Sequence, residues 1–487
     1  MKVYFITFLI VATSNRMLYA QIDFKTYFND QTLRIDYFHT GDAKSESEKI
    51  DAVYKYGRWA GSKKHLTDQL NYGTYLYKII DQQTGTLMFS KGFNSYFIEY
   101  QSTTPAINGE VKTFHESAII PSPKSKFFFV IEKRDTVNKF QVLFQKEIDP
   151  GTQAIDFRTD DPTVNVYTTL DNGKPENKID IAFIAEGYTK QENQKFQDDL
   201  KRVTEAFFSM EPCKSYRSSF NVRGIFKSSA ESGVDEPGAG IFKKTAVGAA
   251  FDALGSERYL LTEDNKSLRD VAAYAPYDAL FIMANSSRYG GGGIYNFYCV
   301  FTSDNFNSNY LMIHEFGHSF FGLADEYYTS STAYNNFFPE GYEPWEPNIT
   351  AEKDSSKIKW SELFTVGTAV PTPWEKKEYD EFDLEWQKQR KILNEHITAL
   401  KKDKSPEVEI SAAKKDYDTR SAEHIRQAQE FLGHSKFEGQ VGAFEGAGYA
   451  STGLYRSSVN CIMFTQANHF CPVCSAAMIK MIDWYCK

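Results

Sequence analysis

Residues 311–328 read LMIHEFGHSFFGLADEYY, and the interpretation of the chain starts from them. His314 and His318 are four residues apart, so on a helix they lie on one face, one turn from each other, and both can reach one metal ion. Glu315 is turned roughly 100° around the helix axis from His314. It stays close enough to the histidine pair to take a proton from a metal-bound water. The spacing therefore predicts a helix that carries a metal site.

A catalytic zinc site normally has three protein ligands and a water, so a third ligand has to be found. Gly322 lies just past the expected helix, where a glycine can adopt the left-handed conformation that turns the chain sharply. This turn would bring Asp325 back to the metal. Glu326 stays the alternative ligand, because spacing alone does not separate two adjacent carboxylates. No histidine occurs between His318 and His396, which excludes a third histidine close by in the sequence.

The pattern H-E-x-x-H is typical of zinc peptidases. It predicts one catalytic Zn²⁺ bound by His314, His318 and Asp325, with Glu315 as the general base that activates water against a peptide bond. The expected partner is a protein or peptide substrate. The apolar residues of the same stretch would also make a good core helix without any metal.

Length and composition indicate a folded protein of several parts. A chain of 487 residues is too long for one ordinary domain and predicts two or three. Its 15% aromatic and 41% hydrophobic residues exclude a disordered chain.

Residues 1–20 have the features of a signal peptide: Lys2, an apolar run over residues 3–12, and Leu-Tyr-Ala before Gln21. We expect cleavage after Ala20 and an exported protein, secreted or periplasmic. The apolar run is too short to span a bilayer, so no membrane span is expected. Loss of Lys2 and Arg16 would take the formal net charge from −9 to −11. An acidic surface disfavours nucleic acid and anionic membranes as partners.

Residues 21–160 read as an all-β sandwich domain. Short segments such as TLRIDYF, GTYLYKIID, SYFIEYQS, KFFFVIEKR and FQVLFQKEI mix β-branched and aromatic residues with polar ones and are separated by turn residues. We find no catalytic constellation in this part. His39, His65 and His115 occur singly, and each is interpreted as a surface or hydrogen-bonded histidine rather than a metal ligand.

Residues 161–487 read as an α/β domain, in which strands at 179–189, 220–228 and 278–287 alternate with helices at 190–210 and 243–255. Four glycines at 290–293 precede an apolar strand. The Gly-Lys-Ser/Thr ending of a phosphate loop is missing, so we interpret a turn into an edge strand. Such a strand beside a metal site can pair with an extended peptide substrate, although an ordinary sheet edge explains the pattern equally well.

Residues 372–435 are highly charged and helix-prone. We expect an inserted helical hairpin that forms a solvated appendage, with gating of the site as the lesser alternative. Its His396 and His424 are expected to face solvent.

Six cysteines permit fifteen full pairings that the sequence cannot choose between. Four of them fall in the last 27 residues, and for an exported chain local disulfides are the leading interpretation. For Cys471-Pro-Val-Cys474 a structural bridge is favoured over a redox pair. A separate zinc site that includes His469 is the weakest alternative.

The segments HEFGHSFFGLADEYY, EGAGYASTGLYRSSVNCIMF and FCPVC resemble the IgA-specific metalloendopeptidases, which belong to or neighbour the metzincin group of zinc peptidases. The resemblance covers residues 160–487, and residues 21–160 resemble the small β domain that precedes this catalytic domain. It implies a metzincin-like α/β zinc peptidase domain behind a β-sandwich. It also implies His314, His318 and Asp325 as zinc ligands, Glu315 as general base and Met463 as the Met-turn beneath the metal. The charged insertion departs from the compact pattern of the family.

Two further questions stay open at this level. Tyr455 and Arg456 are candidates for stabilising an oxyanion only because they precede Met463. The alternative function is an exported binding or adhesion protein that grips a protein or glycan and keeps a structural or inactive metal site. Glu315 argues against it, because a structural site needs no general base. An exopeptidase would need a charged pocket for a chain terminus, and no motif identifies one.

Overall fold

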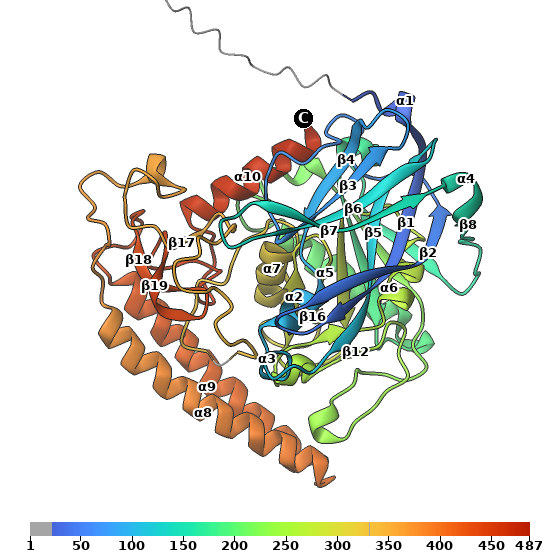
Figure 1. Cartoon of the computed structure of the whole chain (residues 1–487). Coiled ribbons are helices and arrows are strands. Elements are labelled where there is room, and N and C mark those ends of the chain that lie inside the picture. The colour runs from blue at the N-terminus through green and yellow to red at the C-terminus, as the bar shows by residue number, and fades with distance from the viewer. Residues whose placement is uncertain (1–21, 331) are drawn as a thin grey trace, which may run out of the picture.

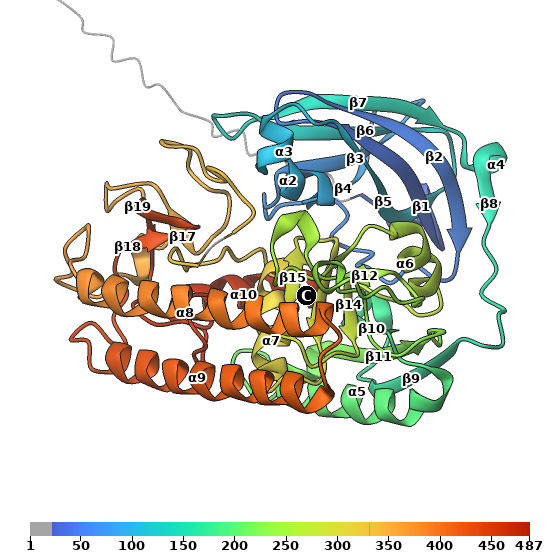
Figure 2. The same cartoon turned by 90° about the horizontal axis from the view of Figure 1, so that it is seen from below.

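The computed structural model describes residues 22–330 and 332–487. The predicted signal peptide lies outside these residues. Mixed α/β structure follows (Figure 1), and in Figure 2 the N-terminal sheets, coloured blue to cyan, lie above the green and yellow sheet of the next part of the chain.

The N-terminal part contains two four-stranded sheets, in the orders β5-β1-β2-β8 and β4-β3-β6-β7. Their inward side chains share one hydrophobic core that includes Leu33 and Ile35 from β1 and Phe129 from β6. Apolar residues alternate with polar ones along these strands because successive side chains of a strand point to opposite faces. The strands are β1 (Phe28–Gly41), β2 (Glu46–Tyr56), β3 (Tyr75–Asp81), β4 (Leu87–Phe93), β5 (Lys112–Pro123), β6 (Phe127–Arg134), β7 (Phe140–Ile148) and β8 (Ala154–Asp156).

One segment predicted as a strand in this part is a helix. Residues 95–102 form α2 (Tyr96–Gln101), whose N-cap Ser95 accepts a hydrogen bond from the Ile98 N–H at 3.4 Å. This cap pairs a backbone N–H within the segment itself, whereas the N–H groups of a strand pair with a neighbouring strand. Two short helices, α1 (Phe24–Tyr27) and α3 (Thr104–Ile107), complete this part, and α4 (Pro150–Gln153) precedes β8.

A six-stranded sheet in the order β15-β16-β14-β10-β11-β9 forms the centre of the C-terminal part. The four inner strands are parallel, and the two edge strands run antiparallel to their neighbours. Every residue of β10 and β14 is buried, as expected for inner strands covered on both faces. The strands are β9 (Asn165–Leu170), β10 (Ile179–Glu186), β11 (Phe220–Phe226), β14 (Ala279–Ala284), β15 (Gly291–Ile294) and β16 (Tyr298–Thr302).

Helices cover this sheet and carry the site. They are α5 (Asn193–Phe207), α6 (Asn265–Ala272), α7 (Ser308–Ser319) and α10 (Pro472–Cys486). The predicted helix at 243–255 is wrong: these residues contain the short strand β12 (Ala249–Ala250), which pairs with β13 (Leu261–Thr262). The buried carboxylate of Glu186 accepts hydrogen bonds from the N–H groups of Val247 and Ala249, at 2.9 and 2.8 Å, which holds this segment extended.

The charged insertion forms two long helices, α8 (Lys376–Lys402) and α9 (Glu407–Gly433), which run side by side in both views (Figure 1, Figure 2). A three-stranded sheet of β17 (Ile349–Thr350), β18 (Phe444–Ala447) and β19 (Ala450–Arg456) lies at one end of this hairpin. Among the described helices, none is both long and apolar enough to cross a membrane.

The two parts of the chain contact each other directly. The Asn94 N–H donates to the Tyr295 carbonyl at 2.9 Å, and the Asn296 side chain donates to the Gly92 carbonyl at 2.7 Å. The ring of His65 stacks on Trp484 of α10, with 4.3 Å between the ring centroids. The N-terminal sheets therefore lie against the edge of the central sheet that also carries the site.

The three N-terminal histidines are hydrogen-bonded, but one of them is not at the surface. His39 is 2% exposed and contacts Glu116 and Glu46, each at 3.1 Å. Burial opposes the charged imidazole, but these carboxylates outweigh it and raise the pKa of His39 to about 9.

Candidate active site

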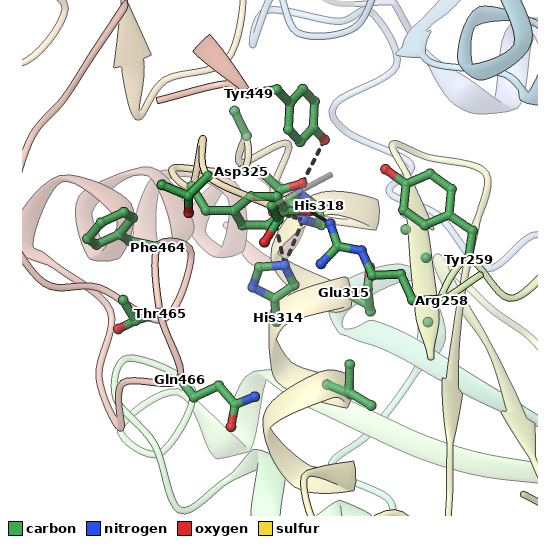
Figure 3. Close-up of a pocket in the computed structure, with 18 of the residues that line it drawn as sticks. Arg258, Tyr259, His314, Glu315, His318, Asp325, Tyr449, Phe464, Thr465 and Gln466 are labelled. Atoms are coloured by element: carbon green, nitrogen blue, oxygen red, sulfur yellow. Dashed lines mark hydrogen bonds and ion pairs between the residues drawn. The ribbon is translucent and has the colours of Figure 1, made fainter. Parts of the chain in front are cut away.

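The side chains of His314, His318 and Asp325 meet at one point on the C-terminal half of α7. The two Nε2 atoms are 3.1 Å apart, and each lies 3.1 Å from Oδ1 of Asp325. Figure 3 shows both imidazoles and the Asp325 carboxylate facing one another. The three predicted ligands are thus brought together, and their role as metal ligands stays a prediction.

The turn after α7 brings Asp325 back to the helix. Gly322 has a φ of +66°, the left-handed conformation expected of it, and the Leu323 N–H bonds to the Gly317 carbonyl at 3.0 Å. Asn348 then holds Ala324 from both sides, accepting from its N–H at 2.8 Å and donating to its carbonyl at 3.0 Å. The third ligand position therefore depends on local backbone geometry.

Each of the three side chains is oriented by a further hydrogen bond. Nδ1 of His314 lies 3.0 Å from the Ile462 carbonyl, and Nδ1 of His318 lies 2.6 Å from the Leu323 carbonyl. The Tyr449 hydroxyl donates to Oδ2 of Asp325 at 2.6 Å, the dashed contact in Figure 3. Such outer partners fix the orientation of ligand side chains and the tautomer of each imidazole.

Met463 packs directly against α7. A Cβ added at Gly317 would lie only 2.7 Å from Sδ of Met463, so this close approach requires a glycine on the helix. Met463 is fully buried, and the glycine that it contacts lies between the two histidines in the sequence. A Met-turn beneath a bound metal stays a prediction for this residue.

Glu315 lies between α7 and the edge strand β15. A Cβ at Gly291 would lie 2.9 Å from Oε1 of Glu315, and one at Gly293 would lie 3.0 Å from Cβ of His318. Gly291 and Gly293 therefore let β15 lie close against α7, because a larger side chain at either position would push the helix away. Burial raises the pKa of Glu315, and the positive charges of His314 and His318 oppose this rise.

An open cleft of about 1610 Å³ lies over the cluster, a volume that includes solvent at its mouth. Residues from the N-terminal part, the central sheet, the loop after α7 and the helical hairpin line it together. The hairpin contributes Tyr379, Asp383, Trp386, Arg390, Tyr417 and His424. The expectation of a solvated appendage is wrong, since one face of the hairpin forms a wall of the cleft.

His424 does not face solvent as expected. Its Nε2 donates to Oδ1 of Asp383 at 2.9 Å, and its ring stacks on Phe382 and on Trp386. The aromatic residues at 379, 382 and 386 follow helical spacing within the charged segment, and this was the signal of a covered face.

Several other candidates lie away from the cluster. The Glu326 carboxylate points to Asn348 and Cys474 instead of the histidines, so it does not replace Asp325. Tyr455 is in the hydrophobic core, and Arg456 is fully buried, with its guanidinium 3.8 Å from the centroid of Phe464. Neither lines the cleft. The idea that they stabilise an oxyanion is wrong.

Arg258 is the cation that the sequence did not single out. It lines the cleft and donates to the Tyr327 hydroxyl at 2.9 Å, and Figure 3 shows its guanidinium extending toward the histidine pair. Tyr449 was missed for the same reason. Both lie more than fifty residues from the motif, and nothing local in the sequence marks them.

The donor set fits a zinc-type ion. Two neutral imidazole nitrogens and a carboxylate are a combination found in catalytic zinc sites, which keep one position open for water. Burial opposes the charged form of Asp325, but the histidines outweigh it and hold its pKa well below the usual range. Asp325 is thus an anionic donor between two imidazoles at the floor of an open cleft.

Comparison with known families decides the class of protein. Residues 168–482 match the model described as IgA Peptidase M64. The chain belongs to the peptidase M64 family. Residues 23–145 match the model of the peptidase M64 N-terminus, and no curated protein matches the chain. The predicted resemblance is confirmed. This M64 protein is therefore a metalloendopeptidase that acts on proteins, and the geometry around His314 and His318 belongs to a peptidase.

Proposed function

We propose that this M64 protein is a zinc-dependent endopeptidase with His314, His318 and Asp325 as ligands and Glu315 as general base. The observation that carries the proposal is the meeting of three donor atoms, mutually about 3.1 Å apart, beside a buried glutamate at the floor of one cleft. A binding protein would not need this glutamate, because a purely structural site uses no base.

When bound, zinc would supply Lewis acidity and lower the pKa of a bound water to about 7. Glu315 accepts the proton of the attacking water and passes it to the leaving amine. Its burial between α7 and β15 restricts the carboxylate to this side of the cleft. Arg258, with its guanidinium aimed into the cleft, is our candidate for stabilising the oxyanion.

The edge strand β15 is the proposed binding surface for the substrate backbone. Gly292 and Gly293 are partly exposed and line the cleft, and Gly293 lies next to Glu315 and His318. The outer backbone groups of Gly291 already bond to Arg258 and Leu260, so an extended peptide would pair with this edge at Gly293, beside the proposed metal site. Recognition would then depend on backbone hydrogen bonds, with side-chain preference set by the cleft walls.

We also propose that the protein is exported and that it combines a β-sandwich with a metzincin-like catalytic domain. The N-terminal sequence features support export. The two four-stranded sheets with a shared core, and Met463 packed beneath α7, support the two architectures.

Mass-spectrometric mapping of cut bonds in a complex peptide mixture tests the proposal, with Glu315→Gln as the blank. Internal cuts made only by the wild-type protein are the expected result, and the flanking residues would define the subsites. Equal patterns from both proteins, with zinc bound to each, would contradict the role of Glu315. They would favour the alternative of an exported binding protein.

A further inference from the structure

A second cluster of metal-binding residues lies outside the cleft. It consists of Glu326, Cys461, Cys471 and Cys474, and one donor atom from each lies within 4.8 Å of the other three. All four residues are fully buried. The six cysteines of the chain are all described, and all are free thiols, so the predicted local disulfides are not formed. His469 is not part of this cluster.

Three separate segments supply the cluster. Glu326 follows Asp325 in the loop after α7, Cys461 lies in the turn that contains Met463, and Cys471 and Cys474 begin α10. The sequence does not predict this cluster, because Glu326 is far from the cysteines in the chain and only the Cys-x-x-Cys pair is local.

The sulfur atoms receive hydrogen bonds suited to thiolates. The Cys471 N–H donates to Sγ of Cys461 at 3.3 Å, and the Cys474 N–H donates to Sγ of Cys471 at 3.4 Å. Oγ of Ser457 lies 3.2 Å from Sγ of Cys471. Cys471 is also the N-cap of α10, a helix of 15 residues, where the helix dipole stabilises a negative charge.

Glu326 gives an independent indication of a bound cation. Its Oε1 accepts from Asn348 at 3.0 Å, but its Oε2 is buried without a hydrogen-bond partner among the residues that the structure describes. An unpaired, fully buried carboxylate oxygen is costly unless a positive charge faces it. Arg456 is buried in the same region and offsets part of the negative charge.

We propose that Glu326, Cys461, Cys471 and Cys474 bind a second, structural zinc ion with tetrahedral geometry. Three thiolates and one carboxylate complete four coordination positions, which leaves none for a catalytic water. The Sγ atoms of Cys461 and Cys474 are 3.8 Å apart. Two sulfurs bound at about 2.3 Å from one zinc at the tetrahedral angle are about 3.8 Å apart, whereas a disulfide requires about 2.05 Å.

The proposed ion stabilises the backbone that positions the catalytic ligands. The Glu326 N–H donates to the Met463 carbonyl at 2.9 Å, and Cys461 precedes Ile462, whose carbonyl orients His314. Glu326 is also the direct neighbour of Asp325. Binding of Glu326 and Cys461 to one ion therefore fixes two backbone segments. One contains Asp325, and the other contains the Ile462 carbonyl that orients His314.

Metal counting on the mature protein tests the proposal. The wild-type protein and the control Cys299→Ser, which changes a buried cysteine of β16, should each contain two zinc ions per chain. The variants His314→Ala/His318→Ala and Cys471→Ser/Cys474→Ser should each contain one. A single zinc in the wild type that the histidine variant loses would overturn the proposal, as would two zinc ions retained by the cysteine variant.

Two further measurements avoid dependence on the cysteine variant, which can fail to fold. X-ray absorption of the histidine variant should show zinc–sulfur distances of about 2.3 Å, and a spectrum without sulfur ligands would contradict the site. Unreduced wild-type protein, denatured with chelator, should titrate as six thiols, the number of cysteines in the chain. Four thiols would indicate a disulfide, and peptide mapping that places it at Cys461, Cys471 or Cys474 would overturn the proposal.

Discussion

Two clusters of proposed metal ligands meet at neighbouring residues, Asp325 and Glu326. Asp325 completes the histidine cluster at the floor of the cleft, and Glu326 completes the cysteine cluster, none of whose residues lines that cleft. The first has three protein donors and a buried base beside it, and the second has four donors and no access. In the proposed assignment the two neighbouring carboxylates have different roles, because a catalytic zinc site keeps one coordination position open and a structural site does not.

The largest effect is expected at the histidine cluster, where Glu315 is the proposed base. Glu315→Gln should lower kcat by about 10³-fold, because proton transfer is lost while the ligand atoms remain. Peptide hydrolysis and zinc content measured on the same sample check this. Glu346→Gln, a change at another buried carboxyl of the cleft, is the matched control and should change kcat only a few-fold. Loss of zinc from the Glu315 variant would contradict its role as a base.

Changes in the cysteine cluster should alter the stability of the protein rather than its catalytic rate. Cys474→Ala should lower the free energy of unfolding by about 4 kcal/mol, the stabilisation given by a ligand present at about a thousand times its Kd. Unfolding by denaturant, with and without chelator, measures it. Cys213→Ala removes a buried thiol elsewhere, so it should cost less, and chelator should destabilise it as much as the wild type but should destabilise Cys474→Ala less. Equal losses in both variants would remove the distinction between the clusters.

A third cluster sharpens the comparison, because a protonated imidazole can supply the positive charge that faces its carboxylates. His39 lies against Glu46, Glu48 and Glu116 in the N-terminal sheets. Its pKa of about 9 in the folded protein exceeds the ordinary value of 6.5. The resulting stabilisation is full below about pH 6.5 and is lost as the pH rises to about 9.

His39→Gln should therefore lower the free energy of unfolding by about 3 kcal/mol near pH 6, and the difference from the wild type should shrink toward pH 9. Denaturant unfolding over this pH range measures it, and chelator should leave the difference unchanged. A difference that is independent of pH would mean that the histidine acts through packing alone.

The smallest effect is expected from the outer partner of Asp325. Tyr449→Phe removes one hydrogen bond to Oδ2 and should lower zinc affinity or activity by about 10- to 100-fold. Competition with a chelator of known affinity measures the first and steady-state kinetics the second. Tyr328→Phe, which removes a hydrogen bond to Asp380 on α8, is the matched control. Equal effects from both variants would argue against an orienting role for Tyr449.

The parts that the sequence predicts are those controlled by nearby residues. Helical spacing predicts α7, and the conformational freedom of Gly322 predicts the turn that returns Asp325. Residues 179–189 predict a buried strand, and β10 is one.

The parts that the sequence does not predict depend on contacts between distant segments. Tyr449 and Asp325 are 124 residues apart, and no spacing rule connects them. His39 had a usable signal, because it continues the alternation of Leu33, Ile35 and Tyr37 toward the core of β1. The helical spacing of the aromatic residues in α8 was also a usable signal, but the many charges of the segment favoured the prediction of a solvated helix.

The N-terminal part of the chain forms some of the cleft wall. Asn94 and Glu99 line the cleft, and Glu99 accepts a hydrogen bond from Tyr334, which lies in the loop beyond the metal ligands. The catalytic part is therefore not a module that can be excised intact at residue 160. Sequence change in the N-terminal sheets can retune which peptides are accepted, while every residue of the metal helix stays the same.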